Sequence, residues 1–382
     1  MDLVLSAEQE LLQQTAREFV ARRSSLRRIR TLRDTQDPDG FSRELWAEMA
    51  RLGWVGILLP EELGGLGLGY MDLMVVLEEL GRGLMPEPML ATVLLGANTV
   101  QLGGSAAHTQ EHLPAVAAGE RLLALAYQEP RSRYDPCHVE TRAERAGGGF
   151  ALRGEKIQVL DGHVADWLIV STRTAGGPRD AEGITLFLVR PDTPGLRIER
   201  QTRLDGRNAA LVLLDGVRVG PEAAVGEIDR GGALLARVLD RATAGLAAEM
   251  LGSMSAAFDM TVEYLKTRVQ FGVPIGSFQA LKHRAAKMYV EIELARSAIM
   301  QAHRVLDEGR GEPAVARAAS IAKARCSDAF VLIGNEGVQM HGGIGMTDEH
   351  DIGFFLKRAR AAATTFGDAV YHRDRLARLD GY

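Results

Sequence analysis

The segment from Arg268 to Gln279 carries residue types that bind a nucleotide diphosphate. It begins Arg268-Val-Gln-Phe271-Gly and ends at Gln279. An Arg guanidinium at the end of a helix pairs with a diphosphate through its planar fork. An aromatic ring beside it covers an adenine or flavin ring. The residue types therefore favour a dinucleotide, although this pattern alone is weak.

A second segment with similar chemistry contains Gln339, Gly342 and Gly343. Paired glycines allow backbone N–H groups to approach a phosphate closely, although such pairs more often only turn the chain. Both segments are expected at helix ends of one helical bundle. Their joint presence strengthens the dinucleotide interpretation.

Residues His108, Glu111 and His112 spell H-x-x-E-H, the inverted pattern of some zinc proteases. A zinc site of that kind needs the motif on a helix and a further ligand downstream. Here two glycines and a proline flank the motif, so no metal is expected. The glycine run at residues 65–69 lacks a preceding strand, and no G-x-S-x-G elbow occurs. A phosphate loop at residues 65–69 and a hydrolase are therefore disfavoured.

The composition is that of an ordinary soluble protein. The 382 residues have a net charge of -5, which predicts no attraction to nucleic acid or to an anionic membrane. No apolar run is long enough for a membrane span, no signal pattern begins the chain, and Cys137 and Cys326 are isolated. The cytoplasm is therefore expected. An arginine-rich stretch is interpreted as a solvated helix face; it contains Arg22, Arg23, Arg27, Arg28, Arg30 and Arg33.

The residue pattern along the chain changes twice, which predicts three domains of an α+β protein. Residues 1–120 have helical periodicity, and Ser6 with Gln9 forms a capping box. Residues 121–228 contain short β-prone runs separated by turns, which predicts a small β-barrel or sandwich. Residues 229–382 return to helical periodicity and predict a four-helix bundle. Its expected helices cover residues 234–266, 278–308, 313–340 and 350–379; the expected strands cover residues 122–127, 150–152, 167–171, 184–189 and 210–214.

The R-x-x-F-G and Q-x-x-G-G segments resemble those of acyl-CoA dehydrogenases. Further similar segments occur along nearly the whole chain: Leu-Gly-Trp-Val-Gly at 52–56, Glu-Glu-Leu-Gly-Gly-Leu-Gly-Leu-Gly at 61–69, Glu-Glu-Leu-Gly-Arg at 78–82 and Asp-Gly-Val-Arg-Val at 215–219. The resemblance implies the acyl-CoA dehydrogenase fold, with an N-terminal helical domain, a middle β-barrel domain and a C-terminal four-helix bundle.

The resemblance also implies a reaction and a cofactor. In this family, a Glu carboxylate removes the α-proton of an acyl-CoA thioester while the β-hydride moves to FAD. FAD usually lies across a dimer interface, so that its pyrophosphate and adenine meet the neighbouring chain. The residues of that neighbour-side set all match here: Arg268, Phe271, Gln279, Gln339, Gly342 and Gly343.

The segments that would face the flavin depart from the family pattern. The family has a small, Gly/Ser-rich loop after Glu-Pro, whereas Glu129-Pro130 is followed by Arg-Ser-Arg-Tyr at 131–134. These bulky side chains are expected to hinder the approach of backbone to the flavin. The family often places Trp and Thr after a Lys; after Lys156, Gln158 and Leu160 stand at those positions. A Leu cannot donate the hydrogen bond of a Thr.

The catalytic Glu is missing at both family positions. Phe366 stands at the commoner position and Ala242 at the alternative one. Three carboxylates lie close in sequence and are weak substitutes: Asp240, Glu249 and Asp368. Asp240 is expected to point away from the site, and Glu249 lies two helical turns beyond Ala242. Each is also explained as an ordinary capping or surface carboxylate.

The two halves of the pattern together resemble one subunit of heteromeric family members. These are the small subunit of pimeloyl-CoA-type dehydrogenases and the acyl-CoA dehydrogenases of steroid side-chain breakdown. The hypothesis is a base-less subunit in a tetramer with a Glu-bearing paralogue, acting on an acyl-CoA and reducing an electron-transfer flavoprotein. One alternative is a self-sufficient homo-oligomeric FAD enzyme with a relocated carboxylate. Another is a non-enzymatic protein on this fold that binds acyl-CoA or a partner.

Overall fold

The structure is a computed structural model that describes residues 4–382. The chain forms two compact units. The helical unit comprises residues 4–35, 70–85 and 243–382, and the sheet unit comprises residues 36–69 and 86–242. The long helix α7, Gly231–Thr267, contributes its first part to the sheet unit and the rest to the helical unit. The domain boundaries expected near residues 120 and 228 stay predictions.

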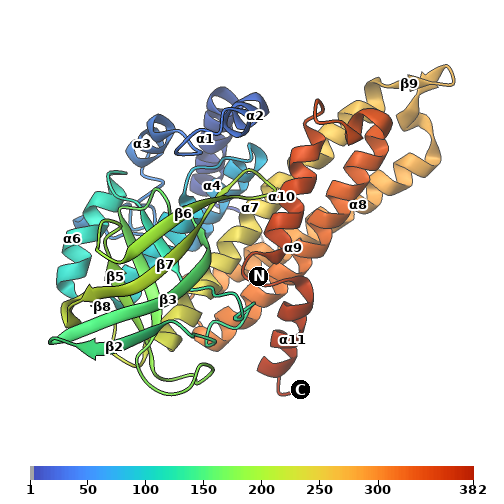
Figure 1. Cartoon of the computed structure of the whole chain (residues 1–382). Coiled ribbons are helices and arrows are strands. Elements are labelled where there is room, and N and C mark those ends of the chain that lie inside the picture. Colours follow the sequence, from blue (N-terminus) through green and yellow to red (C-terminus); the bar gives the residue numbers. More distant parts are fainter. Residues whose placement is uncertain (1–3) are drawn as a thin grey trace. The chain divides into compact units, whose positions relative to one another are not determined.

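The helical unit is built around α9, which packs against α8, α10 and α11. Figure 1 shows these C-terminal helices in orange and red. The capping box predicted for Ser6 and Gln9 is confirmed at the start of α1. Besides α7, the unit contains α1 (Ala7–Arg23), α2 (Leu26–Asp34), α4 (Tyr70–Arg82), α8 (Gln279–Asp307), α9 (Glu312–His341), α10 (Ile352–Thr364) and α11 (Ala369–Leu379), with the short η4 (Ile275–Ser277) and η5 (Gly342–Met346).

Helix α4 is fixed in this unit by ion pairs of its Glu-Glu-Leu-Gly-Arg segment. Glu78 pairs with Arg296 of α8 and Glu79 with Arg17 of α1, each over 2.7 Å. The backbone of α4 also approaches α7 closely, because a Cβ atom at Gly252 would lie 1.7 Å from the carbonyl oxygen of Glu78. The segment of α4 that resembles the family signature therefore contacts three other helices, α1, α7 and α8.

The single helix predicted over residues 350–379 is wrong, because the chain breaks into α10 and α11. Phe366 has a φ of 60° and Gly367 a φ of 112°, and neither value is helical. Asp368 begins α11 as its N-cap, since its side chain accepts a hydrogen bond from the backbone N–H of Tyr371 over 2.8 Å. A glycine commonly ends a helix and an aspartate commonly begins one, so the sequence Gly-Asp could have predicted this break.

The sheet unit contains one mixed eight-stranded sheet in the order β6-β7-β3-β2-β4-β5-β8, with β1 paired in parallel to β4. All five predicted strands are confirmed. The polar strands β2 and β6 were not predicted because their side chains are mostly exposed and lack an apolar run. The strands are β1 (Leu123–Ala126), β2 (Arg142–Ala146), β3 (Gly149–Leu160), β4 (Trp167–Arg173), β5 (Ile184–Val189), β6 (Leu196–Thr202), β7 (Asn208–Val219) and β8 (Ala224–Val225).

Helical segments accompany the sheet in the same unit. The π-helix η2 lies against β1, where Thr92 exchanges hydrogen bonds with the backbone of Leu123. The other segments are α3 (Arg43–Arg51), η1 (Glu61–Leu63), η2 (Met89–Ala97), α5 (Asn98–Gly103), α6 (Ala106–Ala117) and η3 (Pro221–Ala223). Among the described residues, no helix combines the length and apolar character that crossing a membrane requires.

Candidate functional site

A hairpin at the end of α7 presents Arg268 and Phe271 to solvent. Strands β9 (Val269–Gln270) and β10 (Val273–Pro274) pair with each other, and Phe271 and Gly272 form the two-residue turn with φ values of 54° and 79°. Such turns require positive φ at both positions, which is uncommon for a bulky residue. Phe271 is 91% exposed. Figure 1 shows the hairpin, labelled β9, at the outer end of the helices that it joins.

The start of α8 lies beside this hairpin. Gln279 is the first residue of α8 and is exposed. Phe278 directly precedes it, and its ring contacts the Phe271 ring edge-on at 6.0 Å between centroids. Within residues 4–382, the guanidinium of Arg268 makes no ion pair and is exposed. The hairpin therefore offers a cation, two aromatic rings and an amide on one exposed end of the helical unit.

The predicted glycine pair lies at the end of α9, in a loop of residues 342–351 that we call the glycine loop. Gly342 has a φ of 66°, which favours glycine. Among the described residues, nothing lies within 4 Å of where a Cβ atom would stand on Gly342 or Gly343. Gln339 is exposed on the last turn of α9. Backbone at this loop is therefore accessible to a phosphate group.

Three aromatic rings join the hairpin to the glycine loop. Tyr264 lies one turn before Arg268 on α7, and its ring is 4.5 Å from that of His341. His341 is the last residue of α9, and its ring is 4.4 Å from that of His350 in the glycine loop. Burial lowers the pKa of both His341 and His350, so these rings stack as neutral groups near pH 7. The end of α7 and the end of α9, which carry the two motifs, thus meet in one aromatic cluster.

In the sheet unit, Glu129 and Lys156 form a buried ion pair. Lys156 Nζ lies 2.6 Å from Glu129 Oε1 and 3.0 Å from the hydroxyl of Ser171. The Glu129 carboxylate also accepts hydrogen bonds from the backbone N–H groups of Glu140 and Thr141, over 2.6 and 3.0 Å. Burial lowers the pKa of Lys156 to about 8 against the opposing effect of Glu129. This pair ties the two segments that depart from the family pattern to the same point of the sheet.

The departing side chains lie in two places, the loop after Glu129 and strand β3. Arg133 has a φ of 46°, and its guanidinium lies 5.5 Å from the ring centre of Tyr134. Gln158 has a φ of 52° at a bulge in β3 and is exposed, whereas Leu160 is buried. Bulky or apolar side chains therefore stand at the places where the family pattern has small or hydrogen-bonding ones.

The turn that would carry the catalytic base is held by buried basic side chains. The carbonyl oxygen of Phe366 accepts a hydrogen bond from Nε2 of His372 over 3.0 Å. The carbonyl oxygen of Gly367 accepts one from Nζ of Lys323 over 2.7 Å. Burial lowers the pKa of Lys323 to about 7. Phe366 itself has no group that can accept a proton.

The three substitute carboxylates have other environments. Asp368 caps α11. Glu249 accepts a hydrogen bond from Arg358 over 3.0 Å, and both side chains are almost completely buried. Asp240 is 5% exposed, and Ala242 is fully buried on the same helix. Two of these carboxylates thus have a structural contact that explains their presence, as an ordinary capping or paired carboxylate.

The H-x-x-E-H residues also make structural contacts. His108 closes a capping box with Ser105 at the start of α6, and its Nε2 lies 2.7 Å from the carbonyl oxygen of Glu222. His112 is buried against the ring of Trp167, at 5.0 Å between ring centroids. Within residues 4–382, no cluster of metal-ligating side chains is found.

Comparison with known proteins agrees with this architecture. The chain matches the models of the acyl-CoA dehydrogenase N-terminal domain over residues 6–120, the middle domain over residues 124–214 and the C-terminal domain over residues 229–379. The acyl-CoA dehydrogenase IpdE2 of Mycolicibacterium smegmatis is 32% identical over 98% of this chain and 99% of its own length.

Two solved structures of paired chains are also similar. One is from the ChsE4–ChsE5 complex of Mycobacterium tuberculosis, with a TM-score of 0.89, 27% identity and 100% coverage of both chains. The other is a steroid ACAD variant of the Tcur3481–Tcur3483 pair, with a TM-score of 0.86, 33% identity and coverage of 98% of this chain and 97% of that one. With all three domain models matched in order along the chain, this protein belongs to the acyl-CoA dehydrogenase family.

Proposed function

We propose that this chain is the subunit without a catalytic base in a heteromeric acyl-CoA dehydrogenase. It completes an FAD site on a paralogous chain that carries the catalytic Glu. The assembly, a tetramer, oxidises an acyl-CoA to the α,β-unsaturated thioester and passes the electrons to an electron-transfer flavoprotein. The contributed residues are Arg268, Phe271, Gln279, Gln339, Gly342 and Gly343.

One observation carries this proposal: the diphosphate-side residues are complete while the base is missing. Phe366 and Ala242 stand at the two family positions of the Glu. The nearby carboxylates of Glu249 and Asp368 are held by Arg358 and by the start of α11. A self-sufficient enzyme needs its base near the α-carbon of the substrate, and these two groups are already engaged elsewhere.

The exposed residues fit FAD by their chemistry. Arg268 offers the diphosphate a guanidinium that makes no ion pair with any described residue, and the open backbone at Gly342 and Gly343 offers N–H donors. Phe271 offers a solvent-exposed ring to an aromatic ring of the cofactor. Bound FAD would supply the acceptor for the hydride that leaves the β-carbon of the substrate. The residues of this chain bind and orient FAD, and the partner's Glu takes the α-proton.

Two observations support a paired assembly. The similar structures include chains from the ChsE4–ChsE5 complex and from the Tcur3481–Tcur3483 pair. In addition, the departures at Arg133, Gln158 and Leu160 lie in the segments expected to face the flavin. A chain that leaves the flavin to its partner does not need those segments in the family form.

The test is FAD occupancy of the co-purified heteromeric complex with Arg268→Ala in this chain. Loss of the guanidinium removes a charge-assisted contact to the diphosphate, so we expect FAD affinity to fall by at least about tenfold. Lys266→Ala is the matched control, since Lys266 is an exposed cation two residues earlier.

Unchanged FAD occupancy in the Arg268→Ala complex would falsify the proposal. Dehydrogenation by the purified chain alone would favour the self-sufficient enzyme with a relocated carboxylate. Absence of flavin from every assembly would favour a non-enzymatic binding protein.

A further inference from the structure

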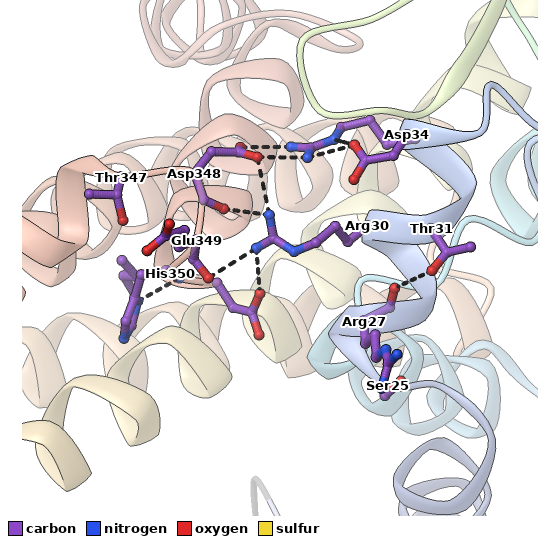
Figure 2. A network of polar contacts seen from close by, with 12 residues as sticks. Ser25, Arg27, Arg30, Thr31, Asp34, Thr347, Asp348, Glu349 and His350 are labelled. Atoms are coloured by element: carbon purple, nitrogen blue, oxygen red, sulfur yellow. Dashed lines mark hydrogen bonds and ion pairs between the residues drawn. The ribbon is translucent and has the colours of Figure 1, made fainter.

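Two arginines of α2 bind the far end of the glycine loop. Arg33 donates two parallel hydrogen bonds to the carboxylate of Asp348, each over 2.7 Å. Arg30 donates to the carboxylate of Asp351 over 2.8 Å and to the backbone carbonyl of Glu349 over 3.3 Å. Figure 2 shows Arg30 extending from α2 to the loop that carries Asp348 and Glu349. We call Arg30, Arg33, Asp348 and Asp351 the arginine clamp.

The interpretation of this stretch as a solvated helix face is therefore wrong for two of its arginines. The side chains of Arg30 and Arg33 are only 23% and 27% exposed. Their guanidinium groups also lie over the ring of Phe354 in α10, at 4.8 and 5.3 Å from its centre. Arg27 on the same helix remains exposed.

The geometry of the clamp makes it rigid. A two-pronged contact between a guanidinium and a carboxylate fixes direction as well as distance. The hydrogen bonds from Arg33 hold the pKa of Asp348 well below its ordinary range, so the carboxylate stays charged at neutral pH. Two guanidinium groups on one helix therefore determine where the loop can lie.

Packing supports the first part of this loop, and polar contacts support its end. Gly345 is buried against α9, because a Cβ atom there would lie 2.5 Å from the carbonyl oxygen of Val338. A pocket of about 210 Å³ borders the loop and is lined in part by Thr347, Asp348 and His350. Residues 346–349 are exposed, so close packing does not fix their backbone and the contacts from α2 contribute to its position.

The clamp is connected to the open glycines through a short series of contacts. Asp348 lies two residues before His350, whose ring packs against that of His341 at 4.4 Å between centroids, tilted by 52°. His341 is followed directly by Gly342, the glycine with a φ of 66°. Movement of the clamped end would therefore displace the stack and the backbone N–H groups beside it.

We propose that Arg30 and Arg33 are positioning residues, which hold the glycine loop in the form that receives the diphosphate of FAD. The inference rests on the proposed function, because it gives the loop that ligand. Arg30 and Arg33 do not touch the cofactor in this proposal; they act through Asp348, Glu349 and Asp351. The inference also assigns a role to two arginines that lie far from the loop in sequence.

The test uses Arg33→Gln in the intact heteromeric complex, with Arg27→Gln as the matched control on the same helix. Hydrogen exchange of peptides covering residues 342–351 is measured in flavin-free protein, and FAD affinity by flavin fluorescence. For Arg33→Gln we expect faster exchange in this loop and an FAD affinity lower by about tenfold. The exchanged-charge pair Arg33→Asp with Asp348→Arg should recover both values, which a general loss of stability would not allow.

Three results would overturn the inference. One is unchanged loop exchange in Arg33→Gln. Another is that Arg33→Gln speeds exchange in the loop but leaves FAD affinity unchanged, while the separate variant Arg268→Ala does weaken FAD binding. The third is an equal effect of Arg27→Gln.

If Arg33→Gln does not fold, Asp348→Asn, which keeps the size of the side chain, decides by the same two measurements. If Arg268→Ala has no effect on FAD either, the proposed function fails. The exchange measurement then still decides whether the clamp holds the loop.

Discussion

Lys323 donates a hydrogen bond from Nζ to the carbonyl oxygen of Gly367 over 2.7 Å, and its side chain is fully buried. The same nitrogen donates to the carbonyl of Ala363 over 3.1 Å and to the hydroxyl of Ser327 over 3.0 Å. These bonds fix the turn between α10 and α11. The turn is therefore held in place although Phe366, which stands at the family position of the base, cannot act as one.

The first prediction concerns the pH dependence that Lys323 brings to stability. Burial lowers its pKa from 10.5 to about 7, so the folded state releases the proton more readily than the unfolded chain does. The stability that Lys323 contributes is therefore complete above the unfolded pKa and is lost as the pH falls toward 7. Relative to Lys323→Met, the wild-type free energy of unfolding should rise by up to about 1.4 kcal/mol per pH unit across this window. Urea denaturation at several pH values measures this, and a pH-independent difference would contradict it.

His372 gives a second pH-dependent prediction in the acid range. Burial, with the nearby positive charges of Lys323 and Arg375, lowers its pKa from 6.5 to about 3. Its contribution is complete above pH 6.5 and is lost as the pH falls toward 3, because the unfolded chain binds the proton first. His372→Asn should therefore lose less stability than wild type on acidification from neutral pH to about pH 4. Parallel acid-denaturation curves for the two proteins would refute this expectation.

The Glu249–Arg358 pair gives a prediction that separates stability from catalysis. Glu249→Gln removes the negative charge that lies 3.0 Å from the buried guanidinium of Arg358. We expect the free energy of unfolding to fall by about 3–5 kcal/mol. The double variant Glu249→Leu with Arg358→Met should recover most of this loss, because both charges are removed together.

The same variants test whether Glu249 is the catalytic base. Turnover per folded complex should remain near wild type in the stable double variant. A fall of several orders of magnitude there would instead assign the base to Glu249.

Phe271 gives a prediction about binding without a change in stability. The residue is 91% exposed, so Phe271→Ala removes almost no buried surface from the chain. The melting temperature of the flavin-free protein should stay unchanged, while FAD affinity of the complex falls by about three- to tenfold through loss of a ring contact. Leu204→Ala, at a 64% exposed apolar residue of the sheet unit, is the control. Equal FAD affinity in both variants would remove Phe271 from the site.

Most of the fold could be predicted because its periodicity is strong. Long helices such as α8 and the buried strand β5 follow directly from apolar spacing. The polar strand β6 could not, since an exposed strand has no apolar pattern to reveal it. Helical periodicity does not reveal the break at Phe366, although Gly367 and Asp368 give a local signal for it.

The candidate site divides in the same way. Arg268 and Gly342 could be proposed from the sequence because the chemistry of a diphosphate site depends on residue type within short motifs. The clamp could not, because the contact of Arg33 with Asp348 joins residues at opposite ends of the chain. Tyr264 and His350 were likewise not predicted, since aromatic stacking across helices leaves no sequence spacing to detect.

The most direct measurement is the ratio of flavin to this chain, by absorbance, for the chain purified alone with added FAD and for its complex with a Glu-bearing paralogue. A base-less subunit that completes its partner's site should bind almost no flavin alone and should appear in a flavin-loaded complex. Near one flavin per chain in the protein purified alone would contradict that role, and would mean that the side chains at Arg133, Gln158 and Leu160 are compatible with a complete flavin site.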